Sequence, residues 1–170
     1  MKYRKLLTAM AAGALLVALI SANSTPAIAG IGDNQCYRFE SAERHFKRRI
    51  NRARVNAGKV RLKLDPELGR VARVHAQAMA RKGYIYHQSH SQLGGRVTRW
   101  VTLGENVGVG STVRSLHRAF MNSPGHRANV LYSSFRNVGV GTTKRHGRLW
   151  VTVVFESQNN PGTTLRMPSC

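Results

Sequence analysis

The stretch FRNVGVGTTKRHGRLWVTVVFE, residues 135–156, decides the fold class of this chain. Its two halves, Phe135–Thr143 and Arg148–Glu156, are rich in the valine and aromatic residues that are typical of β-strands. The link between them, Lys144–Gly147, is short, polar and closed by glycine, which suits a hairpin loop. We therefore predict an antiparallel β-hairpin near the end of the folded part of the chain.

Three helices are predicted upstream of this hairpin. In each of them apolar residues recur every three or four positions, and asparagine, glycine or proline ends the pattern. The second helix has the strongest start, because Asp65, Pro66 and Glu67 supply a cap, a first-turn proline and a first-turn acid. Helices combined with an antiparallel hairpin predict an α+β domain built in layers. The predicted helices cover residues 39–56, 66–82 and 111–122.

Two glycine-rich segments, Gly104–Gly110 and Gly139–Gly141, are interpreted as strands and not as phosphate-binding loops. Neither contains the Walker lysine pattern, and neither lies in the strand–glycines–helix order of a dinucleotide-binding unit. Glycine within a strand lets another backbone approach closely. Residues 84–102 show little periodicity and are predicted to form a loop.

The N-terminus has the layout of a secretory signal peptide. The basic stretch Met1–Lys5 precedes an apolar run, Leu6–Ile20, and a small polar segment ends in the cleavage pattern Ala27–Ala29. The apolar run is shorter than the roughly 20 residues that a membrane span needs, and an uncleaved anchor is the alternative interpretation. We expect residues 1–29 to be removed and the mature chain to be secreted, without a membrane-spanning segment.

The mature chain is strongly basic. The full sequence has 27 Lys and Arg against 7 Asp and Glu, and three of the basic residues lie in residues 1–29, which leaves a mature net charge of +17. The helix predicted at residues 39–56 is especially rich in arginine and lysine. Such charge favours anionic surfaces, so anionic cell-envelope polymers or lipids are the expected partners. Few aromatic residues lie among the arginines, so we expect no specific nucleic-acid partner. A solvated basic face without a partner is the alternative.

The two cysteines, Cys36 and Cys170, lie near the two ends of the mature chain. An exported protein meets oxidising conditions, so we expect a disulfide between them, with two free thiols as the alternative. Closing so long a loop stabilises a fold by about 4–5 kcal/mol on the chain-entropy model. Residues 30–38 are expected to be a lead-in, residues 39–157 the folded domain and residues 158–170 an irregular tail.

The candidate site consists of His87, Glu105 and His126, which lie at the ends of predicted elements, where a scaffold can hold side chains around a cleft. Two imidazoles and a carboxylate are a known zinc ligand set that leaves one position open. The alternative is that these are ordinary structural residues, as we expect for His75 on its apolar helix face. Ser123 with His126 and Glu105 would form a hydrolase set, but the chain has no GxSxG motif, and Ser123 is better interpreted as the end of a helix.

Five segments in order resemble one family. They are LKLDPELGRVARVHAQAMARKGYIYH, LGENVGVG, HRAFMNSPGHRANVL, FRNVGVG and LWVTVVF. Together they are similar to the CAP superfamily, whose SCP-like domain occurs in cysteine-rich secretory proteins, antigen 5 and plant pathogenesis-related proteins, and above all to its compact bacterial members. The resemblance covers about residues 40–156 and implies a three-layer α-β-α sandwich.

The resemblance also implies a cleft lined by two histidines and two acidic residues, which in some members holds zinc or another divalent cation. His87 matches the first histidine, with His90 as its rival, Glu105 the first acid and His126 the second histidine. Ser123 stands where the family has its second acid, so one carboxylate of the set is missing. Asn106 is expected to line the cleft beside Glu105.

The family contains mostly secreted binding or signalling proteins, and the resemblance implies no single activity. We therefore expect a secreted binding protein with a metal-binding cleft and a basic surface, more readily than an enzyme. The alternative is a secreted hydrolase, either metal-assisted or based on Ser123, His126 and Glu105.

Overall fold

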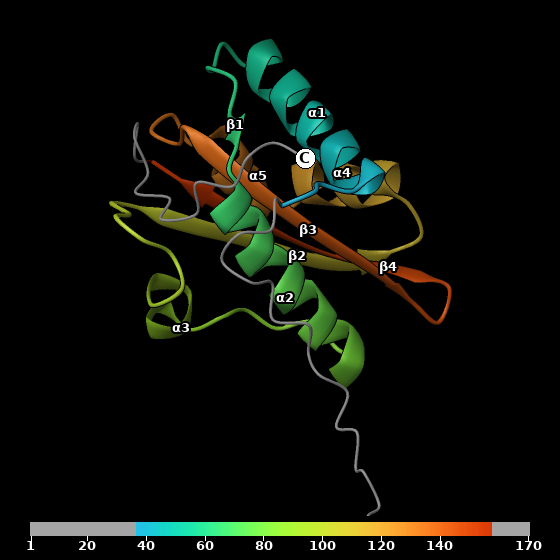
Figure 1. The fold of residues 1–170 in the computed structure, drawn as a ribbon. Coiled ribbons are helices and arrows are strands. Elements are labelled where there is room, and N and C mark those ends of the chain that lie inside the picture. The colour runs from blue at the N-terminus through green and yellow to red at the C-terminus, as the bar shows by residue number, and fades with distance from the viewer. Residues whose placement is uncertain (1–36, 158–170) are drawn as a thin grey trace, which may run out of the picture. The chain divides into compact units, whose positions relative to one another are not determined.

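Helices and strands fill most of the chain in the computed structural model, which describes residues 37–157 (Figure 1). The predicted signal peptide, most of the lead-in, the tail, and the expected disulfide of Cys36 and Cys170 lie outside these described residues. The elements in chain order are α1 (Ser41–Asn56), β1 (Lys63–Leu64), α2 (Pro66–Lys82), α3 (His90–Gly94), β2 (Leu103–Gly110), α4 (Val113–Asn122), α5 (Pro124–Leu131), β3 (Asn137–Arg145) and β4 (Arg148–Glu156).

The four strands form one mixed sheet in the order β1-β3-β4-β2. β4 pairs antiparallel with both β3 and β2, and the short β1 runs parallel to β3. The predicted hairpin is confirmed, but its loop is shorter than expected and consists of His146 and Gly147 alone. Both residues have a positive φ, which is what a two-residue turn of type I′ requires.

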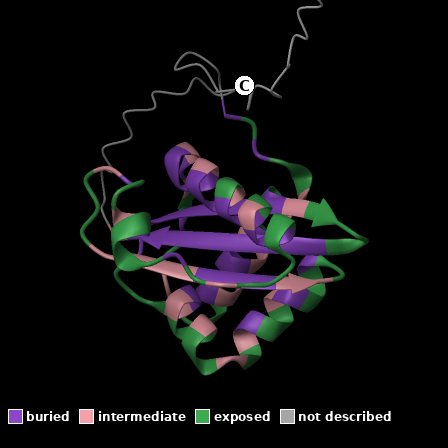
Figure 2. Cartoon of the chain, turned by 90° about the horizontal axis from the view of Figure 1, so that it is seen from below, coloured by how far each residue is buried: buried purple, intermediate pink, exposed green. Residues whose placement is uncertain are grey.

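Helices cover both faces of this sheet, which confirms the α+β class and the three-layer α-β-α sandwich (Figure 2). Along β4, Val151, Val153 and Phe155 pack in one core with residues of α1, α4 and α5. Val154 points to the opposite face and packs with α2. This alternation follows from the two-residue period of a strand, and both faces of β4 are apolar because both are covered.

Glycines in β3 allow α2 to lie directly on the sheet. A Cβ atom built at Gly139 would overlap the backbone of Leu68 and Gly69, and one at Gly141 would overlap the backbone of Ala72 and Arg73. The prediction that these glycines permit close backbone approach is therefore confirmed.

Three elements differ from the sequence-based expectations. The loop predicted at residues 84–102 contains the single-turn helix α3, which begins at a capping box formed by Ser89 and Gln92. Pro124 ends α4, as expected, but it is also the first residue of α5. The first helix begins at Ser41 and not at residue 39. Phe39 lies in the lead-in before the helix and is buried there. Within the described part of the chain, no helix combines the length and apolar character that crossing a bilayer demands.

Candidate functional site

The carboxylate of Glu105 is the centre of the candidate site. Glu105 lies in β2, and its side chain is only 6% exposed. Nδ1 of His87 lies 2.8 Å from Oε2, and the backbone N–H of Gln88 donates to the same oxygen at 3.1 Å. Nε2 of Gln88 donates to Oε1 at 2.8 Å. The carboxylate thus holds the segment after α2 against the sheet, while the side chain of His87 stays 58% exposed.

His75 in α2 holds the backbone segment that precedes His87. Its side chain is buried, and its Nε2 donates to the backbone carbonyl of Tyr86 at 2.8 Å. The same nitrogen lies 3.9 Å from Oε1 of Glu105. His75 is therefore the buried, hydrogen-bonded histidine that we expected, and it also positions the backbone next to His87, which the sequence did not indicate.

His126 lies in the first turn of α5, and its ring packs against Phe120 with 4.8 Å between the ring centroids. Its carbonyl accepts the amide of Asn106 at 2.9 Å, and Nδ2 of Asn129 donates to Oδ1 of Asn106 at 2.9 Å. These bonds tie α5 to β2, so Asn106 is a buried anchor behind the site. Burial and, next, the charge of His87 lower the pKa of His126.

The other two predicted residues take different places. His90 is exposed on the first turn of α3, and the structure pairs His87, not His90, with Glu105. Ser123 links α4 to α5 and is half-buried, and its backbone N–H donates to Ala119. Within residues 37–157 its hydroxyl forms no hydrogen bond with the ring of His126.

The imidazoles of His87 and His126 are the candidate nitrogen donors of the site. In the described part of the chain, no three His, Cys, Asp or Glu side chains are gathered as a metal-binding group. The Glu105 carboxylate accepts hydrogen bonds from Gln88 and lies within hydrogen-bond distance of Nδ1 of His87. A carboxylate that accepts a histidine's N–H is the usual outer partner of a metal-binding histidine.

Three comparisons with known proteins agree with the family resemblance and with the fold. The model of the cysteine-rich secretory protein family (CAP) matches residues 47–155. The protein YkwD of Bacillus subtilis (strain 168) is 34% identical over 107 residues, which are 59% of this chain and 41% of YkwD. An extracellular protein with an SCP domain from Bacillus anthracis str. Ames has a TM-score of 0.62 at 26% identity, over 69% of this chain and 40% of that chain.

The third similar protein is NaASP2, whose structure with Zn²⁺ has a TM-score of 0.55 at 13% identity. The match covers 70% of this chain and 80% of the NaASP2 chain. At that identity the likeness shows the fold alone. The chain spans about two fifths of the length of the two Bacillus proteins.

Proposed function

Because the chain belongs to the cysteine-rich secretory protein (CAP) family, we propose that it is an exported binding protein. Its cleft would bind a divalent cation through His87 and His126, and its basic surface would bind anionic polymers or lipids of a cell envelope. The signal-peptide layout of residues 1–29 and the extracellular Bacillus anthracis neighbour support export.

The observation that carries the cation site is the hydrogen bond between His87 and Glu105. With Nδ1 donating to the carboxylate, Nε2 of His87 remains as the nitrogen that can bind a metal, and the carboxylate orients the ring. The lowered pKa of His126 keeps its ring neutral, as a metal ligand must be. The NaASP2 structure with Zn²⁺ supports zinc as the first cation to test. Bound zinc would supply a Lewis acid with positions open to an oxygen of a ligand.

Calorimetric titration of zinc into the secreted protein tests this site. We expect His87→Ala and His126→Ala each to weaken binding by at least about tenfold, and Glu105→Gln to weaken it by about 10–100-fold through the orientation of His87. His90→Ala is the matched control, because His90 is exposed on α3 and should leave the affinity unchanged.

Two outcomes would contradict the proposed site. If His87→Ala and His126→Ala stay folded and bind zinc as the wild type does, the cleft does not hold the metal. If His90→Ala alone removes binding, a different histidine is the ligand. Zinc affinity should also fall in acid, because protonated imidazoles cannot bind a metal.

A further inference from the structure

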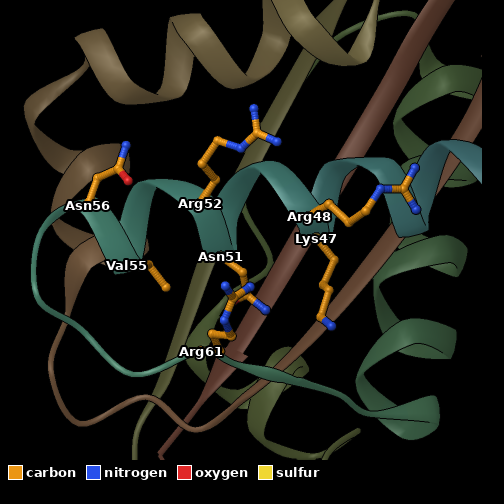
Figure 3. A pocket seen from close by; sticks show the side chains of 7 residues that line it. All are labelled: Lys47, Arg48, Asn51, Arg52, Val55, Asn56 and Arg61. Carbon is orange, nitrogen blue, oxygen red and sulfur yellow. The ribbon is translucent and has the colours of Figure 1, made fainter.

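A basic groove of about 330 Å³ lies along the second half of α1, away from the cleft (Figure 3). Four cationic side chains line it: Lys47, Arg48 and Arg52 from α1, and Arg61 from the segment that follows the helix. Figure 3 shows the side chain of Lys47, which extends from α1, and that of Arg61, which extends from the neighbouring segment, on the same side of α1. Two lengths of chain that run side by side thus contribute charge to one groove.

Buried hydrogen bonds hold the two sides of this groove together. Nδ2 of Asn51 donates to the carbonyl of Leu62 at 3.0 Å, and the N–H of Leu62 donates back to Oδ1 at 2.8 Å. Nε of the buried Arg54 donates to the carbonyl of Val60 at 2.7 Å. Arg61 lies between these two anchored residues, so a ligand would meet a groove whose backbone is already ordered.

No acidic side chain neutralises the groove within the described residues. The ion pairs there join Glu43 to Arg73, and Glu105 to His75 and His87. Arg48 and Arg52 lie four residues apart, on the same side of a helix, and also line an adjoining hollow of about 150 Å³ together with His45 and Arg49. The positive charges therefore form a row that is longer than a single small anion needs.

From this geometry we propose that the groove binds consecutive phosphate groups of a linear phosphodiester polymer. The proposal rests on the anionic-partner part of the proposed function and names its place and its ligand. Guanidinium groups suit phosphate because their N–H groups match two phosphate oxygens at once. A lipid surface fits less well, because Val55 is the single apolar residue that lines the groove, whereas membrane-surface helices present tryptophan, phenylalanine or leucine.

Fluorescence anisotropy with labelled poly(glycerol phosphate), measured over a series of NaCl concentrations, tests the groove. The variant Arg52→Ala/Arg61→Ala removes two groove cations, and Lys144→Ala/Arg145→Ala removes the same charge from the exposed end of the hairpin. We expect the groove variant to lower the slope of log affinity against log salt by about two and to weaken binding by about tenfold or more at low salt. The hairpin variant should change affinity by less than about threefold.

His45 provides a second readout. Its pKa is lowered by burial and then by Arg49, Arg48 and Arg114. A phosphate polymer in the groove would offset these charges, so the pKa of His45, followed by NMR, should rise when poly(glycerol phosphate) is added. An unchanged His45 titration at saturating polymer would overturn the proposal.

The remaining outcomes separate this proposal from the proposed function. Equal losses of affinity in the two double variants would show that the polymer is attracted by the whole basic surface. That result would overturn the proposed groove and leave the proposed binding of anionic partners in place. Tighter binding to phosphatidylglycerol vesicles than to the polymer would identify a lipid partner and overturn the proposal. Absence of binding to polymer and vesicles would overturn both the groove and the proposed binding of anionic partners. The zinc titration would still test the proposed cation site independently.

Discussion

The carboxylate of Glu43 in α1 holds the guanidinium of Arg73 in α2, with Nε donating at 2.9 Å and Nη2 at 2.5 Å. These helices cover opposite faces of the sheet, so this ion pair joins the two outer layers of the sandwich. Oε1 of Glu43 also accepts the backbone N–H of Thr142 in β3 at 3.0 Å. β1 pairs with β3 only at Asn137 and Val138, so the fully buried carboxylate of Glu43 satisfies a donor of β3 beyond the end of β1.

Removing the charge of Glu43 should destabilise the fold strongly. Glu43→Gln leaves the partly buried guanidinium of Arg73 without its counter-charge, and losing one partner of a buried pair costs about 3–5 kcal/mol. Urea unfolding followed by circular dichroism measures this loss. Arg81→Ala on exposed α2 surface is the control and should stay within about 0.5 kcal/mol. A Glu43→Gln protein as stable as the wild type would show that the ion pair does not hold the layers together.

Alanine at Gly141 should push α2 off the sheet. The added Cβ would overlap the backbone of Ala72 and Arg73, and this backbone cannot move unless the whole helix shifts. We expect a loss of about 3 kcal/mol or more in the free energy of unfolding, at the upper end for overpacking. Gly125→Ala meets open space in α5 and should be neutral or stabilising by about 0.5–1 kcal/mol. Similar unfolding midpoints for the two variants would refute this account.

Arg54 is a buried arginine that ties three segments together. Its guanidinium donates to the carbonyls of Val60 at 2.7 Å, Val130 at 2.8 Å and Tyr132 at 3.0 Å. Arg54→Lys should cost at least about 2 kcal/mol, because one ammonium group cannot reproduce the planar set of donors and leaves buried carbonyls unpaired. Arg52→Lys on the exposed side of α1 is the matched control. Equal thermal stabilities of the two lysine variants would count against a structural role for Arg54.

Glu156 should make stability depend on pH. Burial, and then the charges of Asp65 and Glu67, raise the pKa of Glu156 from 4.5 to about 8. Among the described residues neither of its oxygens has a hydrogen-bond partner. Between these pH values the unfolded chain releases a proton that the folded chain keeps, so the free energy of unfolding falls as pH rises.

Glu156→Gln should remove this dependence, since glutamine stays neutral in both states. Urea titrations at pH 5, 6, 7 and 8 should give a flatter stability profile for the variant than for the wild type. Parallel profiles would mean that Glu156 does not carry the effect.

The long elements of the fold follow from local patterns in the sequence. The hairpin has strand-forming composition on both sides of a glycine-containing turn, and α2 has a complete start signal at Asp65–Glu67 and a left-handed glycine, Gly83, at its end. The short elements do not follow in this way. β1 contains two residues, and α5 begins at Pro124, a residue that is equally suited to ending one helix and starting the next.

The candidate site was predictable to the extent that its residues lie at element ends. His87, Glu105 and His126 lie at strand and helix boundaries that the sequence marks, and the family resemblance points to the same three residues. The supporting contacts depend on the folded chain. His75 comes from the middle of α2 and reaches the carbonyl of Tyr86, while Gln88 reaches Glu105 across 17 residues. No local pattern encodes such pairings, because they arise when separate elements pack together.

The acidic residues are placed so that acidification removes very little negative charge from the surface. Within residues 37–157, Glu40 is the one acid that lies exposed, and the carboxylates of Glu43, Glu67 and Glu105 are enclosed by donors or apolar neighbours. Arginine keeps its charge at every pH that a folded protein survives. The surface formed by the described residues therefore stays cationic in acid. Mild acid releases many proteins from cationic matrices by protonating their carboxylates, but residues 37–157 expose almost no carboxylate that it could protonate.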